Sequence, residues 1–428
     1  MKKFIPKKLL DLYHLGFAIL GAKYYGDPSK KLFVVGVTGT KGKSTTSELV
    51  RTVLAGAGHS VALASTIHFR INDEIIPNLF KMTMPGRAYL QWFMREALRK
   101  GCTHIVLEMS SEGATQFRHK GIALDALIFT NLQPEHIEAH GSLEAYAAAK
   151  LSLAHELELS PKQPRYIIAN IDDPLGEEFL KTNVEVRAPF SLADAEPHTV
   201  DDTSVRFVYK NGLYAQAGDL FTVPLPGLFN LRNALAAITF GRAIGIEMVS
   251  LQKSLQYVKP ILGRAERVEA GQPFAVVVDY AHTPDSLKAL FEAYQSKKII
   301  AIIGSTGGGR DKWKRPLMGT IADAYCELTI LTNEDPYDED PHQILGDLAK
   351  GFTAHTPTII LDRREAIAAA LKEAAVLSEK NKTNTVAVLI TGKGTDPYIM
   401  GHKGNKVVWS DKKVAEEELH KLLERGSI

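Results

Sequence analysis

The stretch VTGTKGKSTTSELV, residues 37–50, decides the fold of this chain. An apolar run precedes it, a glycine-rich turn lies in its middle and a helix-compatible run ends it, which is the order of strand, loop and helix in a phosphate-binding loop. Gly39 and Gly42 let the backbone turn its N–H groups toward an anion, and the helix beginning near Lys43 adds its positive end. The stretch therefore predicts a nucleotide site in which Lys43 reaches the terminal phosphates.

One position of this loop departs from the common form. Val37 stands where most such loops have a glycine, five residues before Gly42. A glycine-rich turn that binds nothing is the alternative, but Gly-Lys-Ser-Thr lies where the strand becomes a helix, which favours a nucleotide. Ser44 is then placed to ligate Mg²⁺, which prefers oxygen ligands. We expect a nucleotide site of a less common class.

Length and composition exclude several classes of protein. The chain has 428 residues, 45% hydrophobic and 23% charged, as in globular proteins with several domains. Its 51 basic and 49 acidic residues give a net charge of +2, so no basic field indicates nucleic acid. No apolar run approaches the length of a membrane span. Two distant cysteines fit a reducing, cytoplasmic setting. We expect a monomer with small-molecule substrates.

The first 26 residues combine a basic start with an apolar stretch, as a signal peptide would. Asp11 and His14 interrupt that stretch, however, and apolar residues recur at helical spacing. We predict an amphipathic helix packed on the rest of the chain, with an interfacial or partner-binding helix as the alternative. The apolar side consists of Leu9, Leu12, Tyr13, Phe17 and Leu20.

Buried strands alternate with helices along most of the chain. Apolar runs such as THIVLEM (103–109) and SKKIIAIIGS (296–305) read as strands. Stretches such as SLEAYAAAKLSLAHEL (142–157) read as helices, here with Ser142 as the N-cap. This alternation predicts an α/β fold with parallel sheets covered on both faces.

Residues 187–227 break the alternation and predict a small antiparallel insertion, with turns at Asn211-Gly212 and at 217–219. A stretch rich in glycine and proline at 258–273 indicates a domain boundary. We expect a short N-terminal helical segment (1–33), a central P-loop-type domain with a parallel sheet (34–260) and a C-terminal doubly wound, Rossmann-like domain (261–428).

Polar residues stand where a strand ends in the central part of the chain. Glu108 ends the strand at 103–109, where a carboxylate could hold Mg²⁺ beside a nucleotide, although a lone glutamate is more often a cap or surface residue. His136 and His140 follow in a loop and, taken alone, are ordinary loop histidines as readily as ligands. Lys150 lies in an alanine-rich helix and, taken alone, reads as a solvated lysine.

Three turns in the C-terminal half also carry charged groups. In VVVDYAHTPDSL (276–287), Asp279 and His282 would lie at the carboxyl edge of a sheet. In GSTGGGRDKWKRPLMG (304–319), glycines precede a basic cluster with Arg310, which suits a phosphate or carboxylate, with a flexible solvated loop as the alternative. The third turn, TGKGTDP, also follows a strand.

These stretches, in this order, resemble the Mur ligase family. TGTKGKST is similar to that family's phosphate loop, which tolerates Val37. The resemblance runs from about Val34 to Asp411. EMSSEG followed by QFR, FTNLQPEHIEAHGSLEAYAAAK, LPGLFNLRNALAAI, GRAERV, DYAHTPDSL, RDKWKRPLMG and DRREAI are similar to the branch of UDP-N-acetylmuramoyl-tripeptide synthetases.

The resemblance implies an ATP-dependent amide ligase that also uses Mg²⁺. ATP would phosphorylate the terminal carboxylate of a UDP-MurNAc-dipeptide, and the amine of a diamino acid would attack the acyl phosphate, a step of peptidoglycan precursor synthesis in the cytoplasm. Mg²⁺ would offset the repulsion between carboxylate and phosphate. A related ligase with another carboxylate acceptor, of the polyglutamate or cyanophycin type, and a nucleotide-binding subunit without ligase activity are the alternatives.

The family's functional residues carry over to matching positions. The resemblance implies catalysis by Lys43, Glu108, His136 and Lys150, and a metal held by Ser44, Glu108, His136 and a carbamylated Lys150, in which a cation has become an anion. It implies nucleotide contacts for Gly39, Thr40, Lys41, Gly42, Lys43, Ser44, Thr45, Asn233, Arg264, Asp279 and His282. It implies substrate contacts for Thr83, Ser110, Gln116, Arg118, Arg310, Asp335, Pro336, Tyr337, Gly392 and Asp396.

The sequence departs from the family at the amino-acid motifs. Members that add diaminopimelate carry Asp-Asn-Pro-Arg, whose arginine would grip the distal carboxylate. Here Tyr337 replaces that arginine and offers one hydrogen bond without charge. The family's Gly-Lys-Gly-His-Glu is GKGTD here, so Asp396 keeps a carboxylate on a shorter stem, and Glu112 stands where the branch has histidine. The added amino acid, lysine or another diamino acid, stays open.

A further departure concerns the N-terminus. Only about 33 residues precede the first strand of the resemblance, without a counterpart of the family's uridine-binding domain. An acceptor without UDP, such as a lipid-linked peptide, and a partner that is recruited through the N-terminal helix and supplies the missing surface are the alternatives that this departure leaves open.

Overall fold

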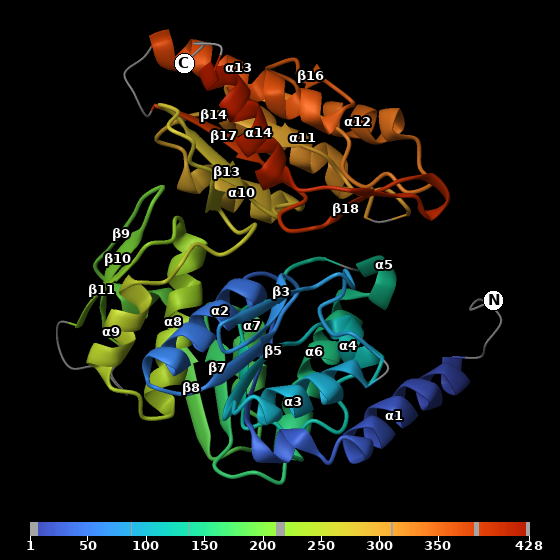
Figure 1. Cartoon of the computed structure of the whole chain (residues 1–428), viewed down its shortest axis with the longest axis vertical. Coiled ribbons are helices and arrows are strands. Elements are labelled where there is room, and N and C mark those ends of the chain that lie inside the picture. Colours follow the sequence, from blue (N-terminus) through green and yellow to red (C-terminus); the bar gives the residue numbers. More distant parts are fainter. Residues whose placement is uncertain are drawn as a thin grey trace. The chain divides into compact units, whose positions relative to one another are not determined.

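The computed structural model describes residues 7–86, 88–135, 137–210, 219–309, 311–380 and 385–424. Within these ranges the chain forms two compact units, each built around its own sheet (Figure 1). The first unit comprises Met1–Thr199, Val205–Pro224 and Phe229–Val258, and the second comprises Val200–Ser204, Leu225–Leu228 and Lys259–Ile428.

An eight-stranded sheet forms the centre of the first unit, in the order β4-β3-β2-β5-β1-β6-β7-β8. The strands from β2 to β8 in this order run parallel, which confirms the predicted α/β architecture. The hairpin of β3 and β4 at one edge is antiparallel and was not predicted, because its strands are too short to show a pattern. The strands are β1 Phe33–Thr38, β2 Val61–Ala64, β3 His68–Ile71, β4 Glu74–Pro77, β5 His104–Glu108, β6 Ala126–Phe129, β7 Tyr166–Asn170 and β8 Val186–Phe190.

The central strands are buried on both faces of the sheet. Successive side chains of a strand point to opposite faces, and Val34 and Val35 of β1 are both fully buried. Helices provide this cover, since α2 packs on β1, β2 and β5, and α6 packs on β6. The helices of this unit are α1 Lys7–Tyr24, α2 Lys43–Gly56, α3 Tyr89–Arg99, α4 Ser111–Thr115, α5 Ile137–His140, α6 Leu143–Glu158, α7 Pro174–Leu180, α8 Leu228–Ala243 and α9 Met248–Gln256.

The predicted antiparallel insertion is confirmed, in a shorter range. β9 (His198–Val200), β10 (Val205–Tyr209) and β11 (Asp219–Val223) form a sheet in the order β11-β10-β9. The first residues of the predicted range belong instead to β8, because that strand pairs in parallel with β7 and extends the main sheet. The predicted turn at Asn211-Gly212 lies outside the described residues.

Helix α1 confirms the predicted N-terminal helix but packs through another side. Its buried residues are Ala18 and Ala22, and a Cβ on Gly21 would lie 2.3 Å from Ala88 Cβ, next to α3. So close an approach leaves room only for small side chains, so the packing predicted for the bulky apolar side is wrong. Among the described residues, no helix has the length and apolar character needed to cross a membrane. The residues of the bulky side, all exposed, are Leu9, Leu12, Tyr13, Phe17 and Leu20.

A six-stranded sheet forms the centre of the second unit, in the order β12-β13-β17-β14-β15-β16. All neighbours are parallel except β12 and β13, and the sheet has the doubly wound form that the alternating pattern predicts. The elements of this unit are β12 Glu266–Arg267, β13 Ala275–Val278, α10 Pro284–Ala293, β14 Lys298–Ile303, α11 Lys314–Tyr325, β15 Leu328–Leu331, α12 Pro341–Ala349, β16 Thr358–Ile359, α13 Arg363–Lys380, β17 Val386–Ile390, β18 Tyr398–Met400, β19 Lys406–Val408 and α14 Asp411–Glu424.

Candidate active site

The loop between β1 and α2 has room only for glycine at two positions. A Cβ on Gly39 would lie 1.9 Å from Thr130 Oγ1, and a Cβ on Gly42 would lie 2.3 Å from Asn233 Oδ1. Both glycines have a positive φ, +147° and +79°, which L-residues rarely adopt. No side chain caps α2, whose first residue is Lys43, so its first N–H groups remain available to an anion.

A segment after β6 fixes this loop from its other side. The Thr40 N–H donates to Asn131 O (2.8 Å), and the Lys41 N–H donates to Asn131 Oδ1 (2.9 Å). Thr130 Oγ1 donates to Lys41 O (2.7 Å), and Lys41 Nζ forms an ion pair with Glu135 (3.0 Å). The loop is therefore held in shape without a ligand, which reduces the entropy lost on binding.

The carboxylate of Glu108, at the end of β5, lies against the start of α2. Ser44 Oγ donates to Glu108 Oε2 (2.9 Å), and Thr66 donates to the same carboxylate through its N–H (2.8 Å) and Oγ1 (3.0 Å). Thr66 Oγ1 also lies 2.7 Å from Thr83 Oγ1. The structure thus brings the predicted metal residues Ser44 and Glu108 together and joins them to Thr83.

Lys150 lies in α6 and is buried, with 1% of its surface exposed. Its Nζ donates to Gly39 O (2.7 Å) and lies 4.3 Å from the centre of the Tyr146 ring. Burial first, and then the nearby cations Lys43 and Lys41, lower the pKa of Lys150 well below its usual value. This residue is therefore not a solvated lysine, and its amine loses a proton far more readily than one in water.

The predicted acceptor residues follow along the same unit. Ser110 caps α4 by accepting from the Gly113 N–H (3.1 Å). Arg118 donates to Gln116 Oε1 and to the carbonyl oxygen of Met84, the residue after Thr83. These predicted acceptor residues follow one another from Glu108 onward, and we call them the acceptor edge: Thr83, Ser110, Gln116 and Arg118.

Asn233 of α8 lies next to Gly42 of the phosphate loop. Its Oδ1 accepts from Thr46 Oγ1 (3.2 Å) and its Nδ2 donates to Asn230 Oδ1 (3.2 Å). Thr45 is buried in the first turn of α2. The contact of Asn233 with adenine stays a prediction.

In the second unit, three predicted nucleotide residues lie together near the end of β13. The guanidinium of Arg264 lies 4.6 Å from the centre of the Tyr280 ring. Asp279 accepts from the N–H groups of Ala265 (2.6 Å) and Ala281 (2.7 Å). His282 Nδ1 lies 2.7 Å from Tyr280 O. The structure therefore brings together, at this end of β13, Arg264, Asp279 and His282.

Lys393 lies buried between two predicted substrate residues after β17. Its Nζ forms ion pairs with Asp335 (2.8 Å) and Asp396 (3.0 Å) and donates to Tyr398 O (2.6 Å). Asp335 also accepts from the Met400 N–H (2.7 Å). The two aspartates therefore meet through a lysine that we had not included among the site residues.

Glu334 lies beside this pair and is buried as well. Its Oε1 accepts from Thr306 Oγ1 (2.8 Å), whereas its Oε2 has no hydrogen-bond partner among the described residues, and burial raises the pKa of Glu334. Gly392 is required here, since a Cβ would lie 2.3 Å from Glu334 Oε2. Tyr337, which follows Pro336, has a φ of +52° and lies against Gly308.

His136 and Arg310 lie outside the described residues. Within the part of the chain that is described, no three His, Cys, Asp or Glu side chains gather as a metal site. The described residues of the predicted Mg²⁺ site are therefore Ser44, Glu108 and Lys150.

Sequence reasoning missed several residues that shape this site. Thr66 follows β2, and its position just after a buried strand was the sequence signal that could have identified it. Its contact with Glu108 arises because β2 lies next to β5 in the sheet, which the sequence does not show. Lys393 stands in the quoted turn TGKGTDP, and its buried position was not visible in the pattern. Others, Thr130, Asn131, Glu135 and Tyr146, act by holding the loop or Lys150.

Comparison with known proteins decides the family. Residues 37–241 match the Mur ligase middle domain, and residues 263–394 match the Mur ligase, glutamate ligase domain. A UDP-N-acetylmuramoyl-L-alanyl-D-glutamate--2,6-diaminopimelate ligase of Syntrophomonas wolfei is 35% identical over 416 residues, which cover 94% of this chain and 81% of that protein. The chain belongs to the Mur ligase family.

Two further relatives agree with this assignment. A UDP-N-acetylmuramyl-tripeptide synthetase of Roseiflexus sp. is 34% identical to this Mur ligase over 445 residues, covering 98% of this chain and 84% of that protein. The solved structure of another UDP-N-acetylmuramoyl-L-alanyl-D-glutamate--2,6-diaminopimelate ligase has a TM-score of 0.62 at 27% identity, covering 96% of this chain and 83% of that one. The predictions of an α/β Mur ligase and of an ATP-dependent, amide-forming enzyme are confirmed.

Proposed function

We propose that this Mur ligase adds an amino acid to the terminal carboxylate of a UDP-N-acetylmuramoyl-dipeptide, in peptidoglycan precursor synthesis. The names of the relatives support this acceptor. The observation that carries the proposal is the hydrogen-bonded line from Ser44 through Glu108 and Thr66 to Thr83. It connects the phosphate loop to the acceptor edge within one unit.

The chemistry requires two anions to approach each other. The loop N–H groups and Lys43 would hold the phosphates of ATP while Arg118 and its neighbours orient the acceptor. A carboxylate oxygen attacks the terminal phosphorus as the bond to ADP breaks. The amine of the amino acid then attacks the acyl carbon, phosphate leaves and the ammonium proton passes to solvent. The cations Lys41 and Lys43 near the loop lower the repulsion in the first step.

Ser44 and Glu108 would hold Mg²⁺. Their fit rests on the chemistry of the donors, a hydroxyl and a carboxylate oxygen 2.9 Å apart at the start of α2. When bound, Mg²⁺ would supply positive charge that offsets the repulsion between the phosphates and the acceptor carboxylate.

We propose further that Lys150 carries a carbamate. Its lowered pKa favours the neutral amine, which attacks carbon dioxide to form a nitrogen–carbon bond and releases a proton. The product is an anion, so Lys41 and Lys43 would face an attractive charge instead of a repulsive one. A ¹³C NMR spectrum recorded with labelled bicarbonate should show a carbamate carbon that is absent from Lys150→Met.

The amino acid is proposed to be a diamino acid bound in the second unit. Asp396 would attract an ammonium group, and Tyr337 would donate a neutral hydrogen bond to a carboxylate. The enzyme is further proposed to act as a cytoplasmic monomer, which the two free, buried cysteines, Cys102 and Cys326, support. Light scattering after size-exclusion chromatography tests the monomer.

Phosphate release from ATP and Mg²⁺ tests the function. The enzyme should release phosphate with UDP-MurNAc-L-Ala-D-Glu and a diamino acid, and not when either is left out. A panel with lysine, ornithine and diaminopimelate identifies the amino acid. Turnover with a polyglutamate or another acceptor, and none with UDP-MurNAc-dipeptide and any amino acid, would overturn the proposal.

A further inference from the structure

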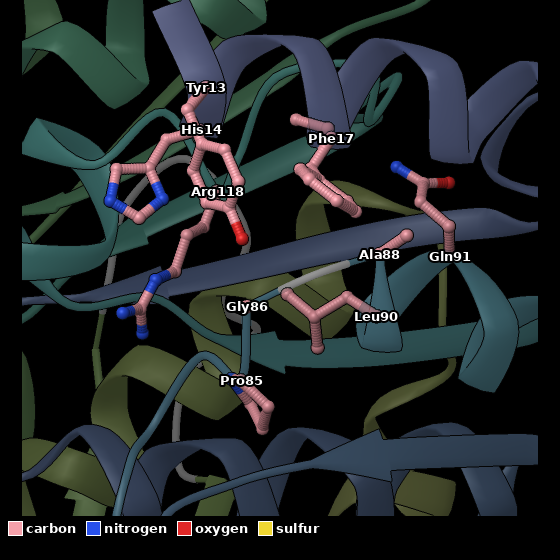
Figure 2. Close-up of a pocket in the computed structure, with 10 residues that line it drawn as sticks. Tyr13, His14, Phe17, Pro85, Gly86, Ala88, Leu90, Gln91 and Arg118 are labelled. Atoms are coloured by element: carbon pink, nitrogen blue, oxygen red, sulfur yellow. The ribbon is translucent and has the colours of Figure 1, made fainter. Parts of the chain in front are cut away.

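A pocket lies between α1 and the segment that leads into α3 (Figure 2). Aromatic side chains of α1 form one side of it, the loop before α3 forms the other, and Arg118 closes one end. All of its residues belong to the first unit. The residues that line it include Tyr13, Phe17, Gly86, Gln91 and Arg118.

The C-terminal half of α1 is fixed on the unit, which determines where the aromatic residues lie. A Cβ on Gly21 would lie 2.3 Å from Ala88 Cβ, and a Cβ on Gly121 would lie 2.9 Å from Ala22 Cβ. The rings of Tyr13 and Phe17, with centres 4.8 Å apart, lie about one to two turns before this anchor and line the pocket. They are also partly exposed, so a ligand can reach them.

The pocket contains polar atoms that lack partners. Arg118 Nε and Gln91 Oε1 are buried atoms without a hydrogen-bond partner, and Gln91 as a whole is only 2% exposed. Among the described residues, no carboxylate forms an ion pair with Arg118, whose guanidinium is bound only by neutral oxygens and a methionine sulfur. Burial lowers the pKa of Arg118. Arg118 is thus a half-buried guanidinium whose Nε lacks a partner and whose nearest acidic influence, the charge of Glu112, forms no ion pair with it among the described residues, so an anionic ligand could form paired hydrogen bonds there.

The pocket shares Arg118 with the predicted acceptor residues. Arg118 donates to Met84 O, Met84 follows Thr83, and Thr83 is hydrogen-bonded to Thr66, which binds Glu108. An acceptor whose carboxylate lies at the phosphate loop would therefore extend past Thr83 and Arg118 toward α1. The part of the acceptor farthest from the reacting carboxylate would enter the pocket.

We propose that this pocket binds a ring joined to a phosphate in the acceptor, with Tyr13 and Phe17 against the ring and Arg118 on the phosphate. This inference rests on the proposed function and extends it to α1. Aromatic faces stack on sugar or base rings, and a guanidinium forms paired hydrogen bonds with phosphate oxygens. The ring is either the sugar or the uracil, and different acceptors can distinguish the two.

Steady-state kinetics of Tyr13→Ala and Phe17→Ala test the proposal. Each variant should raise the KM for UDP-MurNAc-L-Ala-D-Glu about tenfold, the low end of one ring-stacking contact, while kcat and the KM for ATP stay within about twofold. Leu20→Ala is the matched control, because Leu20 is exposed on the same helix but does not line the pocket. Tyr13→Phe keeps the ring and should retain the low KM.

Acceptors of different length identify the ring. If the pocket holds uracil, Tyr13→Ala raises the KM only for the UDP-linked acceptor; if it holds the sugar, MurNAc-1-phosphate-L-Ala-D-Glu shows the same rise. Equal KM values for Tyr13→Ala, Phe17→Ala and Leu20→Ala overturn the inference and leave the proposed function intact. No turnover of UDP-MurNAc-L-Ala-D-Glu by the unaltered enzyme overturns the proposed function, and the inference with it. Circular dichroism confirms that α1 remains helical in each variant.

Discussion

Two buried lysines, one in each unit, have opposite surroundings. Lys150 and Lys393 are both 1% exposed. Lys393 lies between the carboxylates of Asp335 and Asp396. Lys150 has only a carbonyl oxygen and a tyrosine ring as its contacts, with no carboxylate in an ion pair among the described residues. The first unit thus buries an amine that no ion pair among the described residues holds, and that the charge of Glu135 compensates only in part, whereas the second unit buries an amine between two carboxylates.

The difference indicates separate roles. At Lys150, burial outweighs the opposing charge of Glu135 and lowers the pKa, so the amine loses its proton more readily than one in water. An amine held between two carboxylates, as Lys393 is, fixes their positions, which suits the proposed site for a charged amino acid. The comparison can be tested by removing each lysine in turn.

The largest effect is expected for Lys150→Met. Activity should fall about 1000-fold, because the charge that this residue supplies near the nucleotide is lost. The melting temperature should fall less than in Lys393→Met, since the change removes one hydrogen bond, to Gly39 O, and no ion pair among the described residues. Phosphate release and thermal unfolding, measured on the same sample, check both parts.

A short carboxylic acid should partly restore the activity of Lys150→Ala by entering the space that the side chain leaves. Propionate is the probe, and propylamine is the control with the opposite charge. Full activity of either variant without an added acid would contradict the role of Lys150 as an anion.

Lys393→Met should have the opposite profile. It leaves Asp335 and Asp396 buried without their shared cation, at a cost of about 3 kcal/mol in the free energy of unfolding. Urea unfolding followed by circular dichroism measures this loss. Lys298→Met is the control, because its ion pair with Glu327 is 42% and 51% exposed on the two sides and should contribute less than about 1 kcal/mol. Equal losses in the two variants would show that Lys393 is not a compensated ion.

The sequence predicted the phosphate loop more fully than the proposed amino-acid site, for a physical reason. The loop binds through its backbone, and only glycine fits at Gly39 and Gly42, so the pattern itself carries the chemistry. The pocket depends on which side chains meet, and Asp335, Lys393 and Asp396 meet only after β15 and β17 take their places in the sheet.

The N-terminal helix shows a second limit of sequence reasoning. Helical spacing correctly predicted α1, but the bulky apolar side was expected to be buried. The small residues Ala18, Gly21 and Ala22 form the packed side instead. Periodicity alone does not distinguish a side that packs closely from one left exposed for a ligand or another surface.

Tyr337→Arg sharpens the account of the second unit. The change introduces a cation where this chain has a neutral hydroxyl, so the ratio of kcat/KM for diaminopimelate to that for lysine should rise about tenfold. Tyr337→Phe is the control, because it removes the hydroxyl without adding charge. Parallel changes for both amino acids, in either variant, would remove position 337 from amino-acid selection.

The smallest effect is expected at His119, a second buried basic side chain of the first unit. Its contribution to the pH dependence of the free energy of unfolding tests whether such burial is poorly compensated there. Burial lowers its pKa to about 4, with Glu156 at 3.8 Å too distant to reverse the shift. The unfolded chain binds this proton near pH 6.5 and the folded chain only near pH 4, so stability is lost as the pH falls through this window. Between pH 6.5 and 5.5 the loss should be about 1 kcal/mol.

Replacing His119 isolates this contribution. His119→Gln should flatten the decline in the free energy of unfolding between pH 6.5 and 5.5 by about 1 kcal/mol relative to the unaltered chain. His342→Gln is the control, because His342 is exposed on α12 and the described residues offer it no ion pair. If the curves of the unaltered chain and His119→Gln run parallel, the histidine is compensated in the folded state. Poorly compensated burial would then be specific to Lys150. It would be related to the proposed reaction of that lysine and would not be a general feature of the first unit.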